Sequence, residues 1–239
     1  MINLLIALAL GAAAFAGAGL AWGWIAAILP GGLISVIAYG VLAWRTGKQV
    51  EVAMAPVTKA LSGKNFDQAI ALLEPLRALG RWQFLVTPII DAQIGMIYYA
   101  YKADMEKALP YLENGYVKQW QAPAMLAALH YRRKSWDKME QAWELAAKNN
   151  KKTSTVWAGY AWCLWKRGDA ERAQAVLGRG LEAIPGDERL QKNLLALQNG
   201  QKMKMKAYAE EWWALMLEKP PMQVAAAAGR GGRGRRMPR

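Results

Sequence analysis

Three features of this sequence suggest chemistry, and each also has a plainer structural interpretation. The tripeptide Arg167-Gly168-Asp169 has the composition of a cell-attachment motif, but it also suits a turn between two helices. His130 is the only histidine and Cys163 the only cysteine, so a metal site with several histidines cannot form. We expect both residues to be packed in a core rather than reactive.

The remaining charged groups form no recognisable catalytic constellation. The carboxylates of Glu171, Glu182, Asp187 and Glu188 fall on predicted turns and exposed helix faces, where solvated surface charge is the expected role. The segment GRGGRGR (229–235) neither follows a predicted strand nor opens a helix, so it lacks the context of a phosphate-binding loop. We therefore expect a protein that is not an enzyme and that holds no cofactor and no metal ion.

Charge is distributed very unevenly along the chain. The 239 residues carry a formal net charge of +13, yet residues 2–44 contain no Asp, Glu, Lys, Arg or His. As one straight helix this block would be about 65 Å long, roughly twice the hydrocarbon thickness of a bilayer. A hairpin is therefore favoured, with spans near Ile2–Gly19 and Trp24–Trp44. A single broken span is the first alternative, and a cleaved signal peptide, disfavoured because no basic segment precedes the apolar run, is the second.

The residues that flank the apolar block predict its orientation. Trp22, Trp24 and Trp44 fall where an interfacial aromatic belt is expected. Basic residues follow the second span closely, at Arg45, Lys48, Lys59 and Lys64. By the positive-inside rule, residues 2–44 should anchor the chain in the inner membrane with two spans, and the rest should face the cytoplasm.

Beyond Thr46 apolar residues recur with helical spacing, and no segment alternates convincingly as a strand does. Four segments share one pattern: a turn, an apolar or aromatic residue, two or three polar residues, and a residue that opens an apolar helix. They are GKNFDQAIALL (63–73), KADMEKALPYL (102–112), RKSWDKMEQAW (133–143) and KRGDAERAQAVL (166–177). Their close-packing positions are Ala69, Ala108, Met139 and Ala173, at spacings of 39, 31 and 34 residues. We expect an all-α chain of stacked helix pairs.

This pattern resembles the tetratricopeptide repeat family, whose repeats are 34 residues long. The fourth segment matches the family's spacings best, through Trp157, Gly168, Asp169, Ala173, Leu177 and Pro185. The second turn, YAYKAD (99–104), is one residue longer than the family's standard. The resemblance implies an α-solenoid of about four repeats over residues 46–200, which would follow the hairpin anchor that the uncharged block predicts in residues 1–45.

In proteins of that family, the first helix of each repeat lines a concave groove that receives an extended peptide or a partner helix. Carried over to this chain, the resemblance places five residues in such a groove: Tyr131, Arg132, Trp162, Trp165 and Lys166. Aromatic and cationic side chains are effective interface anchors, although a tryptophan at helical spacing is also a common core residue. The implied function is a scaffold or adaptor that binds protein partners at the membrane.

Residues 186–239 divide into three parts. Residues 186–200 should form a helix that closes the end of the solenoid, and residues 201–219 an amphipathic capping helix. The alternative for residues 201–219 is docking on a partner or on the membrane surface. Residues 220–239 should be disordered, with five arginines and no acidic residue: Arg230, Arg233, Arg235, Arg236 and Arg239. This tail suits anionic lipid, RNA or no fixed partner, so a nucleic-acid- or ribosome-associated membrane factor is the alternative function.

Overall fold

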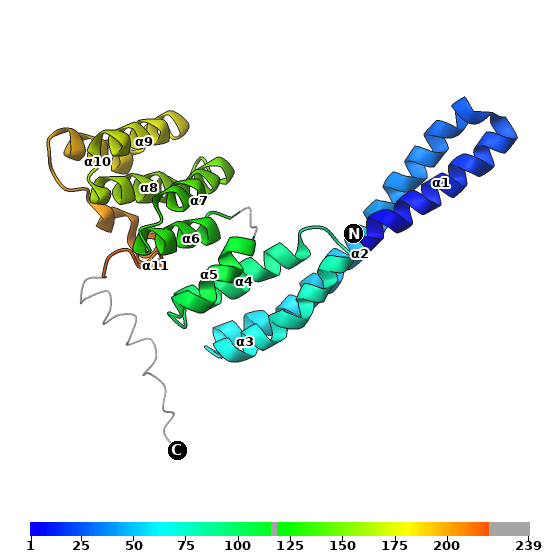
Figure 1. Ribbon diagram of the computed structural model, residues 1–239, viewed down its shortest axis with the longest axis horizontal. Helices are drawn as coiled ribbons and strands as arrows, with labels where there is room; N and C mark the ends of the chain where they lie inside the picture. Colours follow the sequence, from blue (N-terminus) through cyan, green and yellow to red (C-terminus); the bar gives the residue numbers. More distant parts are fainter. Residues whose placement is uncertain (116–118, 220–239) are drawn as a thin grey trace, which may run out of the picture. The chain divides into compact units, whose positions relative to one another are not determined.

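The computed structural model describes residues 1–115 and 119–219, and within these ranges every regular element is a helix (Figure 1). The chain divides into two compact units, Met1–Val117 and Lys118–Arg239. The division falls inside residues 46–200, which the sequence pattern assigned to one repeat domain. Some helix pairs therefore belong to the first unit and the others to the second. The five arginines of the predicted basic tail lie outside the described residues.

The N-terminal unit begins with the hairpin that the uncharged block predicts. Helix α1 (Ile2–Trp22) packs along helix α2 (Trp24–Ser62), and the chain reverses at Gly23, whose φ of 89° favours glycine. By length and composition, both helices are able to cross a membrane. Their large apolar side chains mostly point outward, including Leu20, Ile25 and Leu29.

Glycines allow the two helices of the hairpin to approach closely. A Cβ atom on Gly11 would lie 2.7 Å from the Gly31 carbonyl oxygen, and one on Gly31 would lie 2.8 Å from the Cβ of Phe15. Backbone approach of this kind is typical where helices pack without a hydrophobic driving force between them. The hairpin therefore puts its small residues inside and its large apolar residues outside.

Helix α2 does not end with the apolar block at Trp44. It continues to Ser62 and packs its second half against α3 (Phe66–Leu73), so no break separates the hairpin from the following helices. The rest of this unit consists of the 3₁₀ helix η1 (Glu74–Arg81), α4 (Val86–Ala100) and α5 (Met105–Asn114). Buried apolar side chains of α2, α3 and α4 form one core.

The C-terminal unit contains two further helix pairs, followed by one more helix and a short C-terminal segment. Its elements are α6 (Gln121–Arg132), α7 (Trp136–Asn149), α8 (Ser154–Arg167), α9 (Ala170–Ala183), α10 (Glu188–Gln198), η2 (Met205–Tyr208) and α11 (Ala209–Ala214). Helix α6 packs on α7 and α8 on α9, and α10 contacts both α8 and α9. Residues 201–219 are not the single capping helix that their pattern predicts. They form a 3₁₀ turn and one short helix, and α11 packs on α8.

The four segments with a shared sequence pattern form the same kind of turn. In each, a residue with positive φ follows one helix and precedes the N-cap of the next: Lys64, Ala103, Lys134 and Gly168. The next backbone N–H closes the turn, and those of Asn65, Ser135 and Asp169 donate to the carbonyl five residues back. That of Asp104 reaches six residues back, to Tyr98. The second turn is thus one residue longer, as its sequence predicts.

Local side chains explain where the second helix begins in three of the four pairs; the fourth, α7, follows Ser135, whose side chain makes no capping hydrogen bond. The side chains of Asn65, Asp104 and Asp169 accept hydrogen bonds from the backbone N–H three residues further on, which caps the helix. All four close-packing positions are fully buried: Ala69, Ala108, Met139 and Ala173. Pro185 is exposed and follows the last residue of α9 by two positions, where it stops the helix.

We predict that Ala173→Phe lowers the free energy of unfolding by about 1–3 kcal/mol, because the larger ring would overpack a fully buried position. Ala175 lies two residues further along α9 and is exposed, so Ala175→Phe is the matched control. Urea unfolding followed by circular dichroism measures both. Equal stability of Ala173→Phe and the unchanged chain would contradict the packing described.

Candidate protein-binding surface

The five residues expected to line a groove lie on two helices of the C-terminal unit that contact each other. Tyr131 and Arg132 are on α6, and Trp162, Trp165 and Lys166 are on α8. The Tyr131 and Trp162 ring centroids are 5.6 Å apart, and Lys166 Nζ lies 5.5 Å from the Trp162 ring and 4.7 Å from the Trp165 ring. The structure therefore brings Tyr131, Trp162, Trp165 and Lys166 together, and Arg132 follows Tyr131 at the end of α6. We call the five residues the α6–α8 face.

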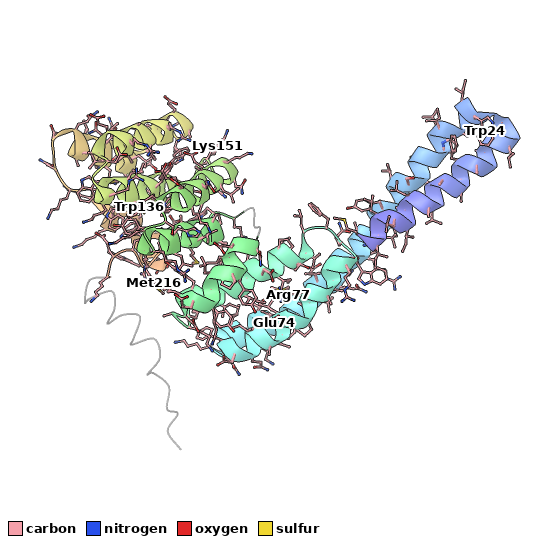
Figure 2. All side chains as sticks on the ribbon, in the orientation of Figure 1. Trp24, Glu74, Arg77, Trp136, Lys151 and Met216 are labelled. Atoms are coloured by element: carbon pink, nitrogen blue, oxygen red, sulfur yellow. The ribbon has the colours of Figure 1, made fainter. Side chains whose placement is uncertain are left out.

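The C-terminal segment, residues 201–219, covers part of this face. The buried ring of Trp212 packs edge-on against Trp162, with centroids 5.1 Å apart. Arg132 Nη2 donates to the carbonyl oxygen of Met216. The Thr155 hydroxyl on α8 donates to the carboxylate of Glu211. One apolar contact and two polar contacts thus hold the C-terminal segment on the α6–α8 face. Met216 is labelled in Figure 2.

Before it reaches that face, the C-terminal segment is tied to α10. Asn193 of α10 is buried, and its Oδ1 accepts from the Lys204 backbone N–H at 2.7 Å, while its Nδ2 donates to the Tyr208 hydroxyl at 3.3 Å. Met203 and Met205 are buried beside it. Burial raises the pKa of Tyr208, so its hydroxyl stays neutral at physiological pH.

The consequence is that the face is only partly open. Trp162 is 3% exposed, so a partner can reach its ring only when Trp212 leaves. Arg132 and Lys166 remain exposed, and Tyr131 and Trp165 are half-buried. The family resemblance placed Trp162 in an open groove, and neither the resemblance nor the helical pattern shows that a residue fifty positions later covers it.

Arg167-Gly168-Asp169 is a helix-to-helix turn. Gly168 adopts φ of 102° and ends α8, and the Asp169 side chain caps α9 by accepting from the Arg172 N–H. Arg167 pairs with Glu140 of α7 at 2.8 Å and with Asp169 at 3.1 Å. The tripeptide is therefore built into the packing of three consecutive helices.

His130 and Cys163 are both buried, at 3% and 0% exposure. Burial raises the pKa of the Cys163 thiol, which outweighs the opposite effect of its contact with Trp143, so the reactive thiolate is scarce. Across residues 1–115 and 119–219, no three or more His, Cys, Asp or Glu side chains gather in a way that could hold a metal ion.

A polar cluster that the sequence pattern missed lies in the N-terminal unit. Asp91 of α4 is buried, and Arg77 Nε lies 2.7 Å from its Oδ1. Glu74 accepts from the Tyr111 hydroxyl at 2.6 Å, and this hydrogen bond, aided by burial, raises the pKa of Tyr111 to about 12. Glu74 and Arg77 are labelled in Figure 2. The cluster joins η1 to α4 and α5, and we assign it a structural role.

Comparison with protein-family models, with curated protein sequences and with solved structures gives no match to this chain. The resemblance to tetratricopeptide repeats rests on the residues alone, and function has to be argued from the chemistry of the surfaces.

We predict that Glu140→Gln lowers the stability of the C-terminal unit at pH 7 by about 1 kcal/mol, an effect that disappears in acid. Burial alone would raise the pKa of Glu140, but hydrogen bonds and charges from Arg172 and Arg167 outweigh it and lower the pKa. A carboxylate with a lowered pKa contributes stability above its unfolded value, about 4.3, and loses it as the pH falls through the folded value.

Denaturant unfolding of the two proteins at pH 7, 5 and 3 measures this difference. The gap in unfolding free energy should shrink between pH 5 and pH 3. Glu171→Gln, on the exposed side of α9, is the control and should change little. A gap that stays constant with pH would contradict the assigned ion pairs.

Proposed function

We propose that this chain is a non-enzymatic, membrane-anchored adaptor of tetratricopeptide-like helix pairs, which binds protein partners through the α6–α8 face. The observation that carries the proposal is the occupant of that face. Trp212 of the short helix α11 packs against Trp162, and Met216 just after the helix accepts a hydrogen bond from Arg132, as a peptide in a groove would. A surface that holds one tryptophan-bearing helix has the shape and chemistry to hold another.

The occupant also indicates what kind of partner would fit. Glu210 and Glu211 directly precede Trp212, while Arg132 and Lys166 on the face are exposed cations. A buried tryptophan is a frequent hot spot, and opposite charges at the rim favour association and orientation. We therefore propose a partner with a short helix that carries an aromatic residue beside acidic ones. Such a partner would have to displace the C-terminal segment, which lowers its apparent affinity.

Membrane anchoring by residues 2–44 is supported by the outward surface of the hairpin. Large apolar side chains along both helices are exposed, among them Leu5, Leu20, Ile25, Leu29 and Val36. Exposure of an apolar surface of this extent to water would be unfavourable in free energy, whereas in a bilayer the same surface contacts the apolar lipid chains. The basic residues after Trp44 support a cytoplasmic location for the helices that follow, in the inner membrane.

We predict that a photo-crosslinking amino acid at Lys166 in the full-length chain captures a defined protein partner in membranes, and that Trp212→Ala increases the yield. Loss of the indole removes the main apolar contact that keeps the C-terminal segment on the face. Glu211→Ala, which removes only the hydrogen bond from Thr155, should give a smaller increase in the same direction.

The same crosslinker at Lys192, an exposed position on α10, is the matched control. Thermal melts establish that the variants remain folded. Adducts that are identical at positions 166 and 192, or no adduct at position 166 in any variant, would argue against a partner on the α6–α8 face.

One observation favours the alternative function, an RNA- or ribosome-associated membrane factor. In the segment KMKMK (202–206) the two methionines are buried and all three lysines are exposed, so the lysines form a short basic edge. Together with the arginines of the tail, this edge would attract phosphates in a salt-dependent way. We predict that deletion of residues 220–239 combined with Lys202→Gln and Lys206→Gln reduces RNA retention at low salt. Unchanged retention would remove this alternative.

A further inference from the structure

The connection between η1 and α4, residues 81–85, lies against the base of the hairpin. The backbone N–H of Asn3 donates to the Trp82 carbonyl oxygen at 3.2 Å. Gln83 Nε2 donates to the Tyr39 hydroxyl of α2 at 3.0 Å, and the Met1 amine donates to the Arg81 carbonyl oxygen. Both helices of the hairpin therefore hold this loop. We call residues 81–85 the base loop.

The side chain of Asn3 connects the base loop to α2. It is 2% exposed, and its Nδ2 lies 2.9 Å from Thr46 Oγ1 and 3.3 Å from Gln83 Oε1. A buried amide that is bonded to two other elements fixes their relative positions, because breaking either bond leaves a polar group unsatisfied. The depth of the base loop along the hairpin is thereby set.

The base loop extends the outward apolar surface of the hairpin. Trp82 and Phe84 are large apolar side chains that are 45% and 57% exposed. Phe84 lines a cavity of about 270 Å³ together with Leu4 and Tyr39, both of which belong to the uncharged spans. Leu4 is itself exposed on α1, so the Phe84 ring lies at the level of a residue that the membrane proposal places in lipid.

Basic and aromatic side chains surround the base loop as they do at a membrane interface. Arg45 and Trp82 line one cavity of about 450 Å³, and Arg45 lines another of about 410 Å³ with Trp44 and Lys48. Lys48 Nζ lies 5.3 Å from the Trp44 ring. Tryptophan prefers the headgroup level, and lysine and arginine there are attracted by anionic lipids.

We propose that the base loop is a second membrane contact, which inserts Phe84 and Trp82 into the boundary between headgroups and acyl chains of the leaflet that the hairpin enters. The proposal rests on the proposed membrane anchoring by residues 2–44. The bilayer then holds the N-terminal unit at the hairpin and again beside it. Two contacts on one rigid base prevent the continued part of α2 from rotating about the hairpin axis.

The test places an environment-sensitive fluorophore on single cysteines of the full-length chain in vesicles that contain phosphatidylglycerol. Cys163→Ala provides the background. The labelled positions are Phe84→Cys in the base loop, Leu33→Cys on the exposed side of α2 within the apolar block, and Glu182→Cys on α9. Lipids with a nitroxide quencher at a shallow or a deep acyl position report the depth of each label.

We expect the label at position 84 to shift to the blue and to be quenched by the shallow quencher more than by the deep one. The label at position 33 should respond to the deep quencher and that at position 182 to neither. Quenching at 33 without quenching at 84 overturns the base-loop proposal alone. Absence of quenching at both positions overturns the membrane anchoring itself.

A second measurement does not depend on a label at position 84. Trypsin cleaves after arginine, and Arg81 begins the base loop. Insertion of the loop into lipid should slow cleavage after Arg81 in the unchanged chain relative to the variant Phe84→Ser, with both proteins in the same vesicles. We expect the variant to be cut several-fold faster after Arg81, with unchanged cutting after Lys192. Equal rates after Arg81 in both proteins would overturn the proposal.

Discussion

Most helices in the described part of the chain have an apolar side that must be kept from water, and their arrangement follows from what covers that side. Within each unit, helices α3 to α5 and α6 to α10 cover it by packing on sequence neighbours, with buried residues such as Ala108 and Ala173 at the closest approach. At the N-terminal end the apolar surface of α1 and α2 stays outward, and at the C-terminal end the chain turns back to cover α8.

The contact between Trp162 and Trp212 gives the C-terminal end its particular chemistry. Two large rings bury each other there, and the surrounding polar contacts are few: one from Arg132 to a carbonyl and one from Thr155 to Glu211. Under the proposed function, a short segment held in this way would compete with a partner helix at a high effective concentration, because it belongs to the same chain.

At the other end, a single buried amide links two environments. Asn3 lies among apolar helices, yet it bonds to Thr46 and Gln83, and so connects the apolar hairpin to the connection that leads into α4. Helix α2 also runs without interruption from Trp24 to Ser62, so the same helix belongs to the hairpin and to the core it shares with α3 and α4. Under the membrane proposal, any tilt of the hairpin in the bilayer is passed directly to α3.

Local chemistry made part of this architecture predictable from the amino-acid sequence. The uncharged residues 2–44 favour a hairpin, because one straight helix of that length would be about twice as long as a bilayer core is thick, and capping residues such as Asp104 and Asp169 mark the turns. The sequence also predicted the extra residue in the second turn, and the hydrogen bond from the Asp104 backbone N–H to the Tyr98 carbonyl oxygen confirms it.

Contacts between distant residues were decided only by the tertiary structure. Helical periodicity states that Trp162 needs a cover but not that Trp212 supplies it, and it gives no sign that Arg77 pairs with Asp91 or that Asn3 meets Gln83. The continuation of α2 past Trp44 is of the same kind, since packing against α3 stabilises it. Local patterns record the preference of each residue for burial or solvent, whereas the identity of its neighbour depends on how the whole chain closes around it.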